Sequence, residues 1–122
     1  MARRPHAPRR LTVDGTDHLW TLRHRHPEGG GCVETLTLRP QPPGRGGPLR
    51  IVFADGPGRY VPGGAPLGSG DVGEVRGAGL NLHEPGAVRA LLDTARARGW
   101  EPDGPAVELD GWGLLAEAAA RR

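Results

Sequence analysis

Four side chains that can ligate a metal or act as nucleophiles lie close together in this chain. His24, His26, Cys32 and Glu34 flank the glycine-rich segment 27–31, PEGGG. Imidazole, thiolate and carboxylate groups are all zinc ligands. If this segment is the whole turn of a β-hairpin, His26 faces Cys32 and His24 faces Glu34, on one face of the sheet. The sequence therefore predicts a candidate metal site at the turn end of the hairpin.

Other interpretations of this group need no metal. The spacing lacks the CxxC and HExxH patterns, and polar residues are expected where a covering helix ends. A shift of one residue in strand pairing would also scatter the group. As a nucleophile, Cys32 would need a base oriented by a third group; His26 could be the base, but the sequence offers no third group. We expect a free, partly buried thiol and rank a metal-binding protein or metal-dependent enzyme as the third hypothesis.

The strands that would position these residues are predicted by alternation. In segments 18–26 and 32–39, one face carries the apolar residues Trp20, Leu22, Leu36 and Leu38, and the other carries Thr21, Arg23, Arg25, Thr35, Thr37 and Arg39. Segment 49–53 adds a third strand, with Leu49, Ile51 and Phe53 facing the core. Shorter strands are expected at 11–13 and 73–76.

A helix is predicted over 85–99. Pro85 suits the first helical position after Glu84 as N-cap, and Gly99 suits the C-terminal end. The apolar stripe is Val88, Leu91, Leu92 and Ala95. A turn at 102–105, a strand at 106–109 and a last helix capped by Asp110 follow. The expected fold is α+β, a mostly antiparallel sheet of about four strands with one main helix packed on one face and a short C-terminal helix.

The segment EPGAVRALLDTARARGWEPDGPAVELDGW resembles the C-terminal part of small uncharacterised α+β proteins of GC-rich bacteria. The resemblance covers about a quarter of the chain and rests on structural residues: Pro85, Val88, Gly99, Trp100, Pro102 and Leu109. It implies an α+β fold and a cytosolic bacterial protein. It implies no activity or site.

A chain of 122 residues is long enough for one domain. Its glycines and prolines cluster, which predicts a flexible basic arm at 1–10 and a single small domain at 11–122. Within that domain, 54–73 is expected to be a long Gly/Pro-rich loop. We favour a flexible insertion over an interaction loop for this segment.

All 16 basic residues are arginine, a composition typical of a GC-rich genome. Residues 1–50 hold nine arginines and four acidic residues, a net charge of +5, whereas 51–122 carry a net charge of −3. This asymmetry suggests an electrostatic partner. The candidate contacts to nucleic acid or to an acidic partner are Arg3, Arg4, Arg9, Arg10, Arg23 and Arg25.

Several classes of function are disfavoured. The G-x-G-x-x-G match at 68–73 has neither a preceding strand nor a following helix, and a Walker A loop requires a lysine that the chain lacks, so we expect no cofactor. No apolar run approaches the length of about 18 residues needed for a membrane span. A single cysteine and the absence of an apolar segment after the N-terminal arginines predict a cytoplasmic protein without a signal peptide.

The favoured hypothesis is a non-catalytic protein-interaction or accessory domain with a protein partner. Its basis is the uneven charge, the long loop and an uncovered sheet face, together with the lack of a catalytic pattern. Nucleic-acid binding through the N-terminal arginine arm is the second hypothesis, although the arm has no aromatic residue to stack a base. The sequence does not determine the partner or the oligomeric state.

Overall fold

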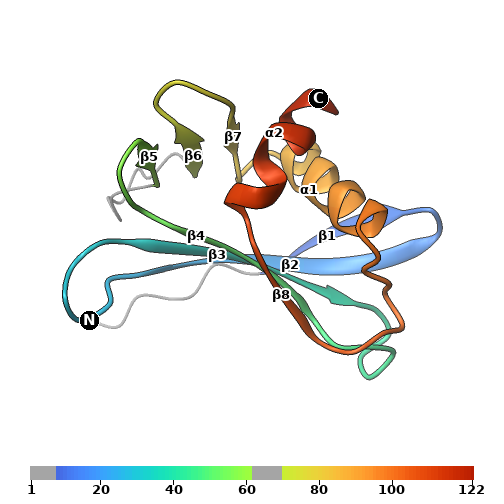
Figure 1. Cartoon of the computed structure of the whole chain (residues 1–122). Coiled ribbons are helices and arrows are strands. Elements are labelled where there is room, and N and C mark those ends of the chain that lie inside the picture. Colours follow the sequence, from blue (N-terminus) through green and yellow to red (C-terminus); the bar gives the residue numbers. More distant parts are fainter. Residues whose placement is uncertain (1–7, 62–69) are drawn as a thin grey trace.

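A five-stranded sheet forms the base of the structure, a computed structural model that describes residues 8–61 and 70–122 (Figure 1). Its strands are ordered β1-β2-β3-β4-β8. They are β1 (Arg9–Val13), β2 (Thr16–Arg25), β3 (Val33–Pro40), β4 (Leu49–Ala54) and β8 (Val107–Asp110). All neighbours pair antiparallel except β4 and β8, which are parallel. The predicted α+β class with a mostly antiparallel sheet is confirmed.

The predicted register of the long hairpin is also confirmed. Trp20 pairs with Leu38, Leu22 with Leu36, and His24 with Glu34. Alternation then places Trp20, Leu36 and Leu38 in the core, each at most 2% exposed. The third predicted strand is β4, whose Leu49, Ile51 and Phe53 are fully buried.

A second, smaller sheet was not expected. It has the order β5-β6-β7 and consists of β5 (Arg59–Tyr60), β6 (Asp71–Glu74) and β7 (Gly79–Asn81). The strand expected at 73–76 therefore lies earlier in the chain and belongs to this sheet. Segment 54–73 also differs from the expected loop, because β4 continues to Ala54, β5 lies within the segment and β6 begins at Asp71. Residues 62–69 of that segment lie outside the described residues.

Both helices lie on the same side of the five-stranded sheet (Figure 1). Helix α1 (Pro85–Ala97) begins at the predicted residue and ends two residues before the predicted Gly99, which has a φ of +103°. All four residues of its predicted stripe are fully buried. Glu84 is the N-cap, but its side chain accepts a hydrogen bond from Arg122 Nη1 at 2.9 Å instead of capping the helix.

Helix α2 (Trp112–Ala120) has Gly111 rather than Asp110 at its N-cap position. Asp110 still receives a backbone hydrogen bond, from the N–H of Trp112 at 3.0 Å. The indole N–H of Trp112 donates to the carbonyl of Ala54 at 2.8 Å. This contact ties the start of α2 to the end of β4.

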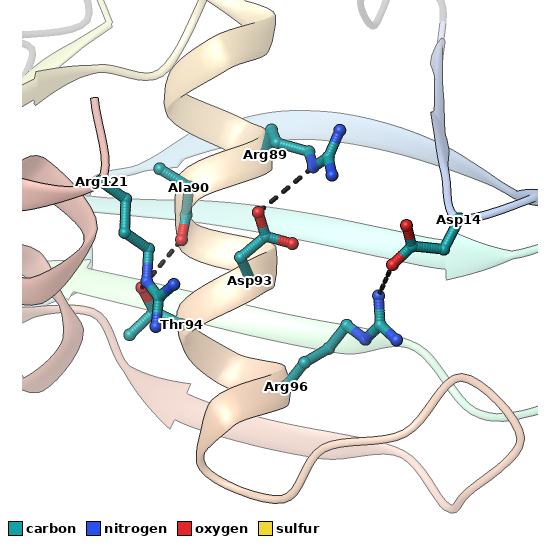
Figure 2. A network of polar contacts seen from close by, with 7 residues as sticks. All are labelled: Asp14, Arg89, Ala90, Asp93, Thr94, Arg96 and Arg121. Atoms are coloured by element: carbon teal, nitrogen blue, oxygen red, sulfur yellow. Dashed lines mark hydrogen bonds and ion pairs between the residues drawn. The ribbon is translucent and has the colours of Figure 1, made fainter.

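A set of polar contacts holds α1 against its neighbours (Figure 2). Arg96 Nη1 lies 2.8 Å from Asp14 Oδ2 in the β1–β2 turn, which links the last turn of α1 to the sheet. The buried Thr94 hydroxyl donates to the Ala90 carbonyl at 2.8 Å and accepts from Arg121 Nε at 3.1 Å. Within α1, Arg89 and Asp93 form an ion pair one turn apart, with Arg89 Nε 3.2 Å from Asp93 Oδ2.

Candidate metal centre

The four predicted ligand residues lie at the turn end of the β2–β3 hairpin. The strand ladder runs as far as the Arg25–Val33 pair, so His26 and Cys32 come just beyond it on either side of the turn. His24 and Glu34 are directly opposed one step back along the ladder. Because side chains alternate between the two faces of a strand, the four candidate ligands lie on the same face of the hairpin as the buried Trp20 and Leu38.

His24 and Glu34 form the most buried part of this group. Glu34 Oε1 lies 2.9 Å from His24 Nδ1, with side-chain exposures of 7% and 17% respectively. An ionised carboxylate can only accept, so in a neutral imidazole this contact places the proton on Nδ1 and leaves a lone pair on Nε2. That Nε2 is buried and has no hydrogen-bond partner among the described residues. A half-buried, oriented imidazole with an unused, buried ring nitrogen is typical of a metal ligand whose other nitrogen is held by a carboxylate.

His26 and Cys32 complete a three-donor group with His24. Cys32 Sγ lies 3.5 Å from His26 Nδ1, and the two imidazole rings meet edge to face with centroids 4.7 Å apart. One donor atom from each of the three residues lies within 4.8 Å of the other two. His26 is exposed, whereas His24 and Cys32 are half-buried.

These distances fit a tetrahedral ion after a small adjustment. Zinc–nitrogen bonds of about 2.0–2.1 Å and zinc–sulfur bonds of about 2.3 Å place tetrahedral donors roughly 3.3–3.6 Å apart. The group would therefore have to contract by about 1 Å, which rotation of the exposed His26 and half-buried Cys32 side chains can provide. Glu34 is not in the three-donor group, and its carboxylate contacts His24 Nδ1 instead. The geometry makes it a residue that orients His24 rather than a fourth ligand.

Asp55 also borders the site, although no sequence pattern pointed to it. Its backbone N–H donates to the Cys32 carbonyl at 2.9 Å. Its carboxylate lies against Gly31, where an added Cβ would come within 2.7 Å of Oδ1. The β3–β4 ladder includes Val33 paired with Ala54, so a correct prediction of that register would have brought Asp55 beside Cys32.

The arginines predicted to contact nucleic acid or an acidic partner are separated by the fold. Arg9 and Arg10 belong to β1, so the expected arm at 1–10 overlaps the sheet at its end. Arg9 Nη1 donates to the His83 carbonyl at 2.7 Å, and its guanidinium lies 4.8 Å from the Trp20 ring centroid. Arg10 lies 3.9 Å from Asp17. Arg3 and Arg4 lie outside the described residues.

Arg23 and Arg25 are exposed, and strand alternation places them on the sheet face opposite to the buried Trp20. They line a groove there together with Arg39 and Arg50. These four arginines lie on the opposite face of the sheet from His24, because successive side chains of a strand point to opposite sides.

No protein-family model, curated protein or solved structure matches this chain. The resemblance to small proteins of GC-rich bacteria therefore stays a prediction. Neither helix in the described parts of the chain has the length and apolarity needed to cross a membrane.

Proposed function

We propose that this protein binds one transition-metal ion at the turn end of the β2–β3 hairpin, through His24, His26 and Cys32. The observation that carries the proposal is the buried, unpartnered Nε2 of His24, whose ring is oriented by Glu34. A buried polar nitrogen without a partner is costly, and coordination to a metal would satisfy it.

The donor set points to a class of metal. Two imidazoles and one thiolate suit borderline or soft ions, with Zn²⁺ as the first candidate and copper as the second. Mg²⁺ and Ca²⁺ prefer oxygen ligands and match this set poorly. Three protein ligands would leave one coordination position for water or for a donor from another molecule.

We place this metal in a binding role and propose no reaction for it. Trp20, Leu36 and Leu38 of the same hairpin are buried in the hydrophobic core, which does not include the three donor residues. The metal would therefore add stability to the hairpin end without being required for the fold. A non-catalytic accessory role, expected from the sequence, is compatible with such a site.

Titration of the untagged protein with Zn²⁺ and Co²⁺ tests the proposal. We expect one ion per chain, and a Co²⁺ spectrum with a thiolate charge-transfer band that disappears in Cys32→Ser. His24→Ala should weaken Zn²⁺ binding by more than about 100-fold, because it removes the oriented ligand itself. His83→Gln is the matched control, since it removes a histidine outside the cluster.

Two results would overturn the proposal. One is a bound metal content far below one ion per chain at saturating Zn²⁺. The other is an equal loss of affinity in His24→Ala and His83→Gln. Circular dichroism of each variant would establish that the hairpin still forms.

A further inference from the structure

The sheet face opposite the helices, here called the open face, carries an unusual concentration of positive charge. No helix covers it, because α1 and α2 both lie on the other side of the sheet (Figure 1). Its central groove is lined by residues from β2, β3, β4 and β8: Thr21, Arg23, Arg25, Thr35, Thr37, Arg39, Arg50, Val52 and Glu108. Four of these are arginines, and one is acidic.

The arginines of the open face differ from those on the helical side of the molecule. Arginines of the two helices and their ends pair with nearby acids, as in Arg89–Asp93, Arg96–Asp14, Arg98–Glu117 and Arg122–Glu84. In contrast, Arg23, Arg25, Arg39 and Arg50 form no ion pair within residues 8–61 and 70–122. Even Glu108, the β8 residue aligned with Arg50, forms no ion pair with it. Neighbouring like charges on a sheet repel each other. An anionic partner would reduce this electrostatic repulsion between the four arginines.

We propose that the open face binds an acidic polypeptide segment. The guanidinium fork pairs bidentately with carboxylates, and the threonine hydroxyls between the arginines can donate further hydrogen bonds. Arg23 and Arg25 are two residues apart on β2 and therefore about 6.6–6.8 Å apart along the strand. Alternate side chains of an extended peptide have the same spacing, so a peptide lying along β2 can present one carboxylate to each.

The other side chains of this face favour a polypeptide over a nucleic acid. The groove has no aromatic residue on which a base could stack. Val52 and Val33, both half-buried, provide apolar surface beside the arginines. Apolar side chains of a peptide can use this surface, whereas a phosphate backbone cannot. The proposal is independent of the metal site, which lies on the other face of β2.

Fluorescence anisotropy with a labelled peptide of alternating glutamate and leucine tests the proposal. The measurement uses the full chain with a chelator present, so that the metal site makes no contribution. We expect binding that weakens as salt rises, and a loss of about fivefold or more in each of Arg23→Gln and Arg50→Gln. A mixed-sequence DNA duplex is the second probe and should bind more weakly than the peptide.

Arg76→Gln is the matched control, because it removes the same charge from an exposed turn residue that forms no ion pair with a described residue. It should change peptide affinity by less than about twofold. The proposal is overturned if the peptide does not bind, if Arg76→Gln weakens binding as much as Arg23→Gln, or if DNA binds more tightly with the same arginine dependence. All three substitutions are at exposed positions, so folding should be preserved to within about 0.5 kcal/mol.

Discussion

His24 and Glu34 face each other across β2 and β3, and a 2.9 Å contact joins His24 Nδ1 to Glu34 Oε1. Register alone brings these residues opposite each other. Glu34 is buried, and His24 Nε2 is buried without a hydrogen-bond partner among the described residues. The imidazole is therefore held in one orientation, unlike a histidine in a surface ion pair. At the proposed metal site, the carboxylate would therefore act through His24 and not by direct coordination.

Substitution of Glu34 tests this indirect role. Glu34→Gln retains an acceptor for His24 Nδ1 but removes the charge, so Zn²⁺ affinity should fall by about 10-fold. Glu34→Ala removes the acceptor as well and should lower the Zn²⁺ affinity by up to about 100-fold. Competition with a chromophoric chelator measures both values. Glu117→Gln, an exposed α2 residue, should leave the affinity unchanged, and a Glu34→Gln protein with full affinity would contradict the assignment.

The buried Thr94 hydroxyl should contribute to the packing of the two helices. Thr94→Val keeps the shape of the side chain but removes the acceptor for Arg121 Nε. We expect a loss of about 1–2 kcal/mol in the free energy of unfolding, because Arg121 loses a buried hydrogen-bond partner (Figure 2). Urea denaturation measures it. A double-mutant cycle with Arg121→Gln should show coupling, and strictly additive effects would refute a direct interaction.

Because His18 is buried, we predict that the free energy of unfolding depends on pH in the mildly acidic range. His18 is 1% exposed, and burial, aided by the charges of Arg45 and Arg96, lowers its pKa from the ordinary 6.5. As pH falls, the unfolded chain takes up this proton before the folded chain does, so the free energy of unfolding decreases. The loss should begin near the unfolded pKa of 6.5 and continue down to the lowered folded pKa.

His18→Phe removes the titrating group and should flatten this part of the stability profile. Metal-free protein, denatured in urea at a series of pH values, provides the measurement. His83→Gln serves as the control and should retain the wild-type slope. If His18→Phe has the wild-type slope as well, other groups cause the pH dependence.

The turn before α2 leaves no room for a side chain at Gly111. A Cβ there would lie 2.5 Å from two carbons of the Phe53 ring, which itself packs edge-on against Trp112 at a centroid distance of 5.2 Å. Gly111→Ala should therefore destabilise the protein by about 1–3 kcal/mol. Gly56→Ala, where the added Cβ has no neighbour within 4 Å, should be nearly neutral. Equal midpoints of chemical denaturation for the two variants would contradict this packing.

The ion pair between Asp14 and Arg96 should affect titration more than stability. A hydrogen bond from Arg96 and its charge lower the pKa of Asp14 below the ordinary 3.8. Arg96→Gln should return this pKa toward its ordinary value, as measured by NMR titration of the Asp14 carboxyl. At pH values above the pKa that Asp14 has in the unfolded chain, the ion pair stabilises the fold. This contribution is lost as the pH falls through the lowered pKa of Asp14 in the folded chain. An unchanged Asp14 pKa in the variant would contradict the contact.

Local patterns were sufficient for the hairpin and for the main helix. Alternating polarity on both sides of one glycine-rich turn allows a single register that buries Trp20 with Leu38, and this register also brings His24 opposite Glu34. Pro85 and the apolar stripe likewise predict the start and the buried side of α1. These features depend on residues close in sequence, so their signals reinforce one another.

Long-range pairing could not be predicted in the same way. The parallel alignment of β8 with β4 joins residues more than 50 positions apart, and the β5-β6-β7 sheet is built from short strands interrupted by glycines. Neither has a strong periodic pattern. The contacts of individual arginines could not be predicted either. Arg9, for example, contacts the His83 carbonyl and the Trp20 ring, and no sequence pattern places these groups beside it.

The sequence by itself determined which side chains gather at the hairpin end, because strand alternation and one turn dictate that proximity. Only the tertiary structure decided their separate roles. Burial of Glu34 against His24 leaves three donors instead of four, and the adjacent β4 strand brings Asp55 to the Cys32 backbone. Side-chain direction and burial depend on contacts between distant segments, and those contacts exist only once the sheet has assembled.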